Sequence, residues 1–166
     1  MTSMDTTLAP TASWLQTLKG LFIRPTRLQV AALCHRSASG EPDVLLVTSR
    51  DKGRWILPKG WPEPDLEAHE TAALEAFEEA GVRGDVDQTM YGSFRSHKGM
   101  ANGSKIPTRV LVYRIAFGEQ VETFREKGQR QVVWMSVSRA IETADEPGLR
   151  RLLKRFRADM RRSAAI

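Results

Sequence analysis

Three glutamates at helical spacing constrain this chain more than any other feature of its sequence. Segment 57–82 reads LPKGWPEPDLEAHETAALEAFEEAGV and carries Glu75, Glu78 and Glu79 shortly before a glycine, Gly81. Residues at i, i+3 and i+4 share one stripe of a helix, so the three carboxylates face the same way and repel one another. Hard cations such as Mg²⁺ or Mn²⁺ prefer carboxylate oxygens and keep open positions for substrate phosphates. The pattern predicts a metal-binding helix that serves phosphate chemistry.

The same helix also needs a face that packs on the rest of the protein. Apolar residues recur at helical spacing at Leu66, Ala73, Phe77 and Ala80, which predicts that these four side chains are buried. Gly81 is the expected end of the helix.

Segment 57–82 resembles the Nudix box, the signature of the Nudix hydrolase family. That signature is Gly, five residues, Glu, seven residues, Arg-Glu, an apolar residue, any residue, Glu-Glu, any residue, Gly and an apolar residue. The matching positions here hold Gly60, Glu75, Ala76, Glu78, Glu79, Gly81 and Val82. Two positions depart from the signature, because Leu66 stands where the first Glu is expected and Leu74 where the Arg is expected. In the family that Arg helps to orient the carboxylates.

The resemblance implies an α/β fold, namely an α/β/α sandwich with a mixed β-sheet, and attack by water on a phosphorus atom of a diphosphate linkage. It implies that Glu75, Glu78 and Glu79 bind Mg²⁺ or Mn²⁺ together with the backbone carbonyl of Gly60. Either Glu75 or Glu78 is the expected general base, since the family varies on this point. Some relatives use another carboxylate from a later loop, for which the candidates are Glu119, Glu122 and Glu126.

Basic residues from three segments surround the box and predict a phosphate-rich substrate. They are Arg50, Lys52, Arg54 and Lys59 before the box, Arg95, His97, Lys98, Lys105 and Arg109 after it, and Lys127 and Arg130 further on. Arginine offers a planar fork and lysine a mobile point charge, and phosphate sites use both.

The likeness extends beyond the box, over residues 27–141. TSRDKGRWILPKGW resembles the same region of diphosphoinositol polyphosphate phosphohydrolases, where Ser and Arg contact substrate phosphates, which implies such roles for Ser49 and Arg50. Arg130, in EKGQRQVVWMSVSRAI, is the nearest match to a phosphate-binding basic residue of that group. The PKG turn is instead similar to diadenosine polyphosphate hydrolases. The expected substrate-binding residues are therefore Ser49, Arg50, Arg54, Lys59 and Arg130.

Three functional hypotheses follow, and the first is a metal-dependent pyrophosphohydrolase acting on diphosphoinositol or dinucleoside polyphosphates. The second is removal of oxidised nucleoside triphosphates or of an RNA 5′ pyrophosphate, in which Trp55, Trp61 or Phe94 would stack on a base. Trp55 is assigned to the core in preference to that role. The third is a binding module that recognises a phosphorylated ligand without hydrolysing it. Nucleic acid is not expected as a partner, and the sequence leaves the oligomeric state open.

The rest of the sequence predicts one domain over residues 26–166, preceded by an extension, residues 1–25, with a short amphipathic segment around Trp14. Strands are expected at 27–35, 43–49, 55–57, 86–98, 106–117 and 132–135, and residues 119–130 are expected to be a loop. Ser136 is expected to cap a helix over 137–143, and Pro147 to open the last helix.

Charge and cysteine content predict where the protein works. The net charge of +5 belongs mostly to the last helix, where residues 150–162 hold seven basic side chains against Asp159 alone. Leu149, Leu152, Leu153, Phe156 and Met160 alternate with those charges, so this helix is expected to dock its apolar side on the domain. No secretory signal or membrane-spanning run is recognisable, and Cys34 is expected to be a buried, inert thiol. A cytoplasmic location is the resulting expectation.

Overall fold

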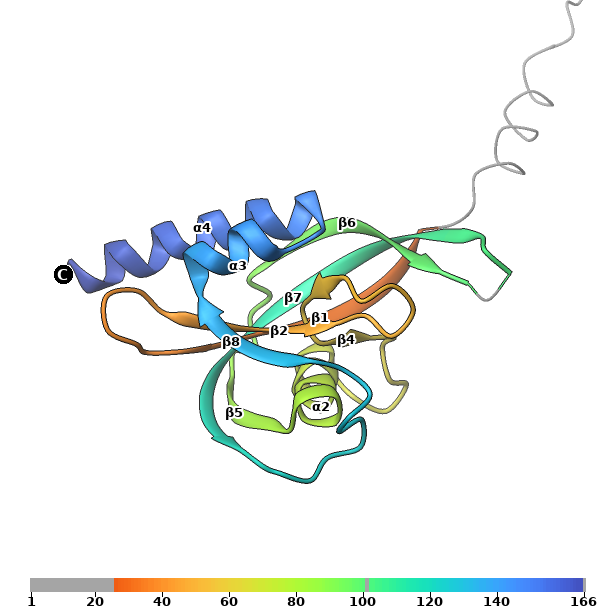
Figure 1. Ribbon diagram of the computed structural model, residues 1–166, viewed down its shortest axis with the longest axis horizontal. Coiled ribbons are helices and arrows are strands. Elements are labelled where there is room, and N and C mark those ends of the chain that lie inside the picture. Colours follow the sequence, from red (N-terminus) through yellow and green to blue (C-terminus); the bar gives the residue numbers. More distant parts are fainter. Residues whose placement is uncertain (1–25, 101, 166) are drawn as a thin grey trace, which may run out of the picture.

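A mixed eight-stranded sheet with helices on both faces organises the domain (Figure 1). The structure is a computed structural model and describes residues 26–100 and 102–165. Helix α2 packs on one face of the sheet, and helices α3 and α4 pack on the other. This arrangement confirms the predicted α/β/α sandwich with a mixed sheet.

The bounds of the elements are as follows. The strands are β1 (Arg27–Arg36), β2 (Asp43–Thr48), β3 (Trp55–Ile56), β4 (Lys59–Gly60), β5 (Val82–Val86), β6 (Gly92–Gly99), β7 (Lys105–Gln120) and β8 (Val132–Ser136). The described helices are α2 (Ala68–Ala80), α3 (Val137–Thr143) and α4 (Pro147–Ala164).

Strand β1 lies at the centre of the sheet because both of its faces are covered. It pairs in parallel with β7, from Arg27 opposite Thr108 to His35 opposite Ala116, and antiparallel with β2 and β4. Its side chains alternate between the two cores, so that Leu33 packs towards α4 and Ala32 towards α2. Double burial explains why β1 is a continuous apolar run instead of an alternating pattern.

The buried stripe of helix α2 overlaps the predicted one in part, because Ala80 is buried as predicted whereas Ala73 and Phe77 are half-buried. Its buried apolar residues are Ala72, Ala76 and Ala80, whereas Leu66 is exposed. Leu66 precedes the N-cap, Glu67, so it never joins the helical stripe, and the prediction for this residue was wrong. Glu67 and Glu70 form a reciprocal capping box that begins the helix, and the left-handed Gly81 ends it as predicted.

The expected strand 86–98 begins instead at Gly92, as β6, because the separate strand β5 ends at Val86 and a turn at Asp87 follows it. The Asp87 carboxylate accepts hydrogen bonds from the backbone N–H of Thr89, at 3.0 Å, and from Arg114 of β7, at 2.7 Å. This turn lets both β5 and β6 pair with β7. Strand β7 is also longer than predicted, and the loop after it begins at Val121.

A glycine at the bulge between β5 and β7 is expected to be essential for stability. A Cβ at Gly84 would overlap the carbonyl of Ala116, whose carbon would lie only 2.9 Å away. Because the obstacle is backbone, Gly84→Ala should lower the unfolding free energy by about 2–3 kcal/mol. Urea titration of this variant beside Gly92→Ala, whose Cβ would have its nearest neighbours at 3.4 Å, measures the effect. Equal midpoints for both variants would contradict the prediction.

The two C-terminal helices follow the sequence predictions closely. The Ser136 side chain caps α3 by accepting a hydrogen bond from the backbone N–H of Arg139, and Pro147 opens α4. Helix α4 buries its apolar stripe against the sheet, as expected from its spacing; the buried side chains are Leu149, Leu152, Leu153 and Phe156. Its basic residues therefore face outwards or line its edges.

Cys34 is fully buried in β1, and burial raises the pKa of its thiol to about 12. The prediction of a buried thiol is confirmed, and the raised pKa makes it unreactive near neutral pH. The amphipathic segment expected around Trp14 lies outside the described residues. Among the described helices, none is long and apolar enough to cross a bilayer.

Candidate active site

Glu75 lies directly against the backbone of Gly60. Strand β4 pairs with β1, with Gly60 opposite Val30, and this pairing fixes the box loop next to α2. A Cβ at Gly60 would overlap the Glu75 carboxylate, since even its farther oxygen, Oε2, would be 2.9 Å away. Only glycine therefore leaves room for this carboxylate, which explains on steric grounds why the first position of the box is a glycine.

Glu79 is buried and paired with an arginine from a distant loop. Its carboxylate accepts from Arg130 Nη2 at 2.6 Å and from the backbone N–H of Lys59 at 3.3 Å. The side chains of Arg130 and Glu79 are only 6% and 5% exposed. Arg130 Nε also donates to Glu126 at 2.6 Å, and its Nη1 donates to the carbonyl of Thr48 at 3.1 Å. Arg130 is thus fixed at three points.

Glu78 faces the loop that leads from β7 to β8. Arg125 Nη1 lies 2.9 Å from both of its carboxylate oxygens, and the Arg125 side chain is largely exposed. The backbone N–H of Glu126 donates to the Glu78 carbonyl at 3.0 Å. These contacts seat the loop on the end of α2 and bring Glu126 beside the box.

Glu126, one of the three later carboxylates proposed from the sequence, lies at this site. It contacts Arg130, as described above, and its other oxygen is 3.6 Å from Arg50. Glu119 instead pairs with Arg83 on the exposed part of the β5–β7 ladder. The structure therefore places four carboxylates around the end of α2, facing the arginines of one loop and one turn.

The carboxylates at this site carry more negative charge than the fold neutralises. Burial, followed by the charges of Glu78 and Glu126, raises the pKa of Glu75 to about 7. Burial also raises the pKa of Glu79 to about 8, with Glu75 and Glu126 adding to the effect and Arg130 opposing it. Both raised pKa values mean that the site favours a bound proton or another cation, because either one relieves the repulsion between the carboxylates.

The donor set at this site suits a hard divalent cation. Within the described residues, no three or more Asp, Glu, His or Cys side chains converge on a point where they could hold a metal ion. Glu78 and Glu79 are instead turned towards arginines. The site has surplus negative charge and offers hard oxygen ligands from Glu75, Glu78, Glu79 and the Gly60 carbonyl. This set of ligands fits Mg²⁺ or Mn²⁺.

The raised pKa values predict a stability profile that metal should change. A carboxyl whose folded pKa exceeds its ordinary value of 4.5 stabilises the fold fully below pH 4.5. That contribution is lost as the pH rises through about 7 for Glu75 and about 8 for Glu79.

In EDTA, the unfolding free energy should therefore fall by several kcal/mol, at most about 6 kcal/mol, between about pH 5 and pH 8.5. Chemical denaturation across this range measures it. Replacing both Glu75 and Glu79 with Gln should flatten the profile, and Mg²⁺ should restore stability at high pH. A flat profile for the unaltered protein in EDTA would contradict the prediction.

A cavity of about 210 Å³ opens beside the box glutamates and gathers the predicted substrate residues. Its lining includes Ser49, Arg50, Arg54, Lys59, Glu79 and Arg130. Ser49, Arg50 and Arg54 belong to the turn before β3. A hydrogen bond closes this turn, in which the Ser49 side chain accepts from the backbone N–H of Arg54 at 3.0 Å. Burial lowers the pKa of Lys59. Glu75, Glu78 and Gly60 are not among the lining residues.

Two walls of the cavity carry polar atoms without partners among the described residues. Arg54 Nε and Gln29 Oε1 are buried and make no hydrogen bond there. Gln29 was not predicted as a site residue, although a glutamine within the apolar run RLQVAALC is the signal that could have identified it. Unpaired buried polar atoms are costly, so their presence in one cavity indicates a ligand that pairs with them.

The basic segments behind the box divide between two places. His97 and Lys98, at the end of β6, line the cavity beside the glutamates. Arg95 and Arg109 line a separate pocket that reaches α4. Between these two places lies a further pocket in which two of the predicted basic segments meet; its basic lining residues are Lys52, Arg54, Arg95, His97 and Lys105.

Comparisons with known proteins agree with this geometry. The NUDIX domain profile matches residues 25–156. Nudix hydrolase 21, a chloroplastic protein of Arabidopsis thaliana, is 34% identical over 126 residues, which cover 73% of this chain and 60% of that protein. Diphosphoinositol polyphosphate phosphohydrolase 3-beta of Bos taurus is 32% identical over 116 residues, which cover 69% of this chain and 66% of that protein. The chain thus spans less than two thirds of the length of these relatives.

Solved structures support the fold. An Ap4A hydrolase of C. elegans superimposes with a TM-score of 0.60 at 19% identity, covering 82% of this chain and 99% of that one. The NUDIX domain of Shewanella oneidensis NrtR, complexed with ADP ribose, gives a TM-score of 0.62 at 17% identity and covers 92% and 99%. With the profile match and the box glutamates on α2, these similarities show that the chain belongs to the Nudix hydrolase family.

Proposed function

We propose that this protein is a divalent-metal-dependent pyrophosphohydrolase that cleaves a diphosphate linkage in a highly phosphorylated small molecule. The observation that carries the proposal is the basic cavity beside the box glutamates, which brings Ser49, Arg50, Arg54 and Lys59 next to Glu79. Phosphate-binding groups and carboxylates that suit a metal are thereby held side by side.

Glu75, Glu78, Glu79 and the Gly60 carbonyl would hold Mg²⁺ or Mn²⁺. Such an ion, when bound, lowers the pKa of its water and screens charge on phosphate oxygens. Glu75 or Glu78 would take the proton from the attacking water. The raised pKa of Glu75, about 7, supports it for this role, since a general base works best when its pKa is near the operating pH.

The basic residues of the cavity would bind and orient the substrate phosphates. Arg50 and Arg54 belong to the turn before β3, so both can reach the same phosphate group from one side. The unpaired Nε of Arg54 would donate to a phosphate oxygen, and Lys59 would add a point charge. Arg130 would act chiefly by holding Glu79, because its donors already bind Glu79, Glu126 and Thr48.

The lining of the cavity supports a diphosphoinositol polyphosphate ahead of a nucleotide. Its residues include no Trp, Tyr or Phe. Trp55 is partly buried against the α4-side core and Phe94 is buried, so neither offers an open ring to a base there. Similarity to diphosphoinositol polyphosphate phosphohydrolases points the same way. The proposal includes a cytoplasmic location, supported by the lone buried thiol, Cys34.

The test is a product assay with purified protein and Mg²⁺ or Mn²⁺. The panel holds a diphosphoinositol polyphosphate, diadenosine polyphosphates, oxidised nucleoside triphosphates and triphosphate-ended RNA. We expect metal-dependent cleavage of the first compound, reduced at least about 100-fold in Glu79→Gln. Glu119→Gln is the matched control, because Glu119 pairs with Arg83 away from the cavity, and its activity should be unchanged.

Each other outcome selects a different function. Preference for oxidised nucleotides or for RNA would replace the proposed substrate with the second sequence-based hypothesis. Metal binding without cleavage of any compound would support the third hypothesis, a binding module. Cleavage that survives Glu79→Gln would show that the box glutamates are not the catalytic site.

A further inference from the structure

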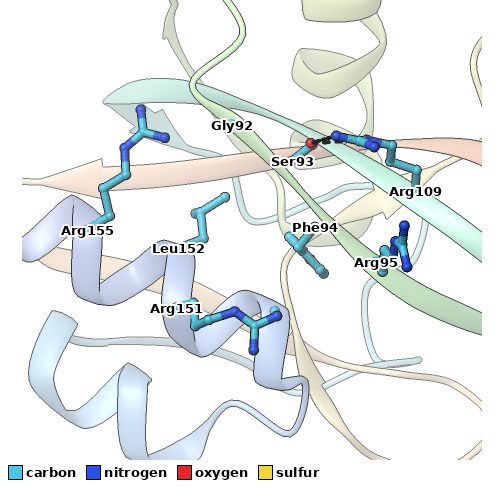
Figure 2. A pocket seen from close by; sticks show the side chains of 9 residues that line it. Gly92, Ser93, Phe94, Arg95, Arg109, Arg151, Leu152 and Arg155 are labelled. Carbon is cyan, nitrogen blue, oxygen red and sulfur yellow. Dashed lines mark hydrogen bonds between the residues drawn. The ribbon is translucent and has the colours of Figure 1, made fainter.

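A second, larger pocket lies between the start of β6 and the first half of α4 (Figure 2). Its volume is about 520 Å³, and four arginines line it: Arg95, Arg109, Arg151 and Arg155. The first two come from neighbouring strands, β6 and β7, and the other two lie one turn apart on α4. No acidic residue is among those that line the pocket.

Two of these arginines are held in place by neighbouring groups. Arg109 donates from Nε and Nη2 to Ser93 Oγ, at 3.2 and 3.0 Å, as Figure 2 shows. Arg155 donates from Nη2 to the backbone carbonyl of Tyr91 at 2.8 Å, and its guanidinium lies over the Tyr91 ring at 4.5 Å. One carboxylate, Asp159, comes within 3.7 Å of Arg155 Nε. These contacts orient two guanidinium groups before any ligand arrives.

The other two arginines keep their donors available. Arg95 and Arg151 are exposed and make no hydrogen bond or ion pair that involves a side chain within the described part of the chain. Arg95 also lies directly opposite Arg109 in the β6–β7 ladder. Like charges placed directly across a sheet destabilise it, so this pairing is unfavourable until an anion binds between them.

We propose that this pocket binds a compact anion carrying two or more phosphate groups, at a site distinct from the one that hydrolyses substrate. Four arginines match the bidentate geometry of several phosphate groups, and the volume suits a small molecule. The aromatic residue that lines the pocket, Phe94, is 6% exposed and offers no face on which a nucleic-acid base could stack.

The two sites are separated along a single strand. Ser93 and Arg95, near the start of β6, line the arginine pocket, whereas His97 and Lys98, at its other end, line the cavity beside the glutamates. Arg95 lies about 7 Å along the strand from His97, and both also line a pocket between the two sites, so the sites adjoin but share no lining residue. Occupancy of the arginine pocket therefore needs neither the box glutamates nor a metal ion.

The test uses inositol hexakisphosphate, which carries no phosphoanhydride bond, and full-length protein in EDTA. Backbone amide signals of Gly92 and Gly148, which line the pocket, are followed by ¹H–¹⁵N NMR during the titration. We expect both signals to shift and saturate. The double variant Arg95→Gln, Arg151→Gln should weaken this binding at least about tenfold. The control, Lys154→Gln with Arg161→Gln, removes the same charge from exposed positions of α4 outside this pocket and should change it less than about twofold.

Three outcomes would overturn the proposal. The two glycine signals would stay unmoved if the ligand bound elsewhere. Equal weakening in both double variants would show general attraction to a basic helix instead of a built site. Saturable shifts with a single-stranded oligonucleotide but none with inositol hexakisphosphate would make the surface a nucleic-acid contact. None of these results depends on whether the proposed hydrolysis occurs.

Discussion

Replacing Arg130 with methionine is expected to lower the unfolding free energy by about 3–5 kcal/mol and to remove hydrolytic activity. The substitution would leave Glu79 and Glu126 facing each other in a site where the Glu79 side chain is 5% exposed. A buried carboxylate that loses its partner keeps its desolvation cost and loses the compensating attraction. Urea denaturation at about pH 9, above the pKa of Glu79, measures the stability with this carboxylate ionised, and the product assay measures the activity.

The matched control is Arg125→Met in the same loop. Arg125 also pairs with a box glutamate, Glu78, at 2.9 Å, but its side chain is 72% exposed. Solvent screens such a pair, so this variant should lose less than about 1 kcal/mol. Arg130→Lys keeps the charge but offers a single point of contact where the guanidinium makes three bonds, so it should recover only part of the stability. If both methionine variants lost equal stability, burial of Arg130 would not be the cause.

Gly60→Ala is expected to reduce hydrolysis by about 100-fold while leaving the fold largely intact. The added methyl group would overlap the Glu75 carboxylate, which is the end of a flexible side chain and can move aside. The protein should therefore fold, but Glu75 would no longer lie against the box loop. Thermal denaturation checks the fold, and the product assay with Mg²⁺ measures the loss.

A double-mutant cycle with Glu75→Gln shows whether the effect passes through that carboxylate. If Gly60→Ala acts by displacing Glu75, adding it to Glu75→Gln should cost little further activity. Fully additive losses would instead mean that the methyl group disturbs something else, such as the approach of substrate. Mn²⁺ binding followed by electron paramagnetic resonance should weaken in Gly60→Ala in parallel with activity.

Features of the fold that depend on local chemistry were predictable from the sequence. Ser136 as a cap, Pro147 as a helix start and Gly81 as a helix end each act within one turn of chain. The break between β5 and β6 was not predictable in this way. It depends on Asp87 meeting Arg114, 27 residues later in the sequence, and no short-range signal contains that contact.

The same distinction applies to the candidate site. Spacing alone places Glu75, Glu78 and Glu79 on one part of α2, because helical geometry fixes it. The partner of Glu79 is Arg130, which comes from 51 residues away and which similarity suggested as a phosphate contact. Leu74 occupies the position where the family has the arginine that orients the carboxylates. In this fold the guanidinium that pairs with Glu79 belongs to Arg130, in the loop before β8.

The parallel pairing of β1 with β7 has a consequence for how the chain folds. β1 shares two residue pairs with its neighbour in sequence, β2, but nine with β7, whose residues lie roughly 80 positions further along the chain. The contact order of the central sheet is therefore high, which slows folding. A nascent chain that ends before β7 cannot cover the apolar β1, so on the ribosome the sheet should form late and in a single cooperative step.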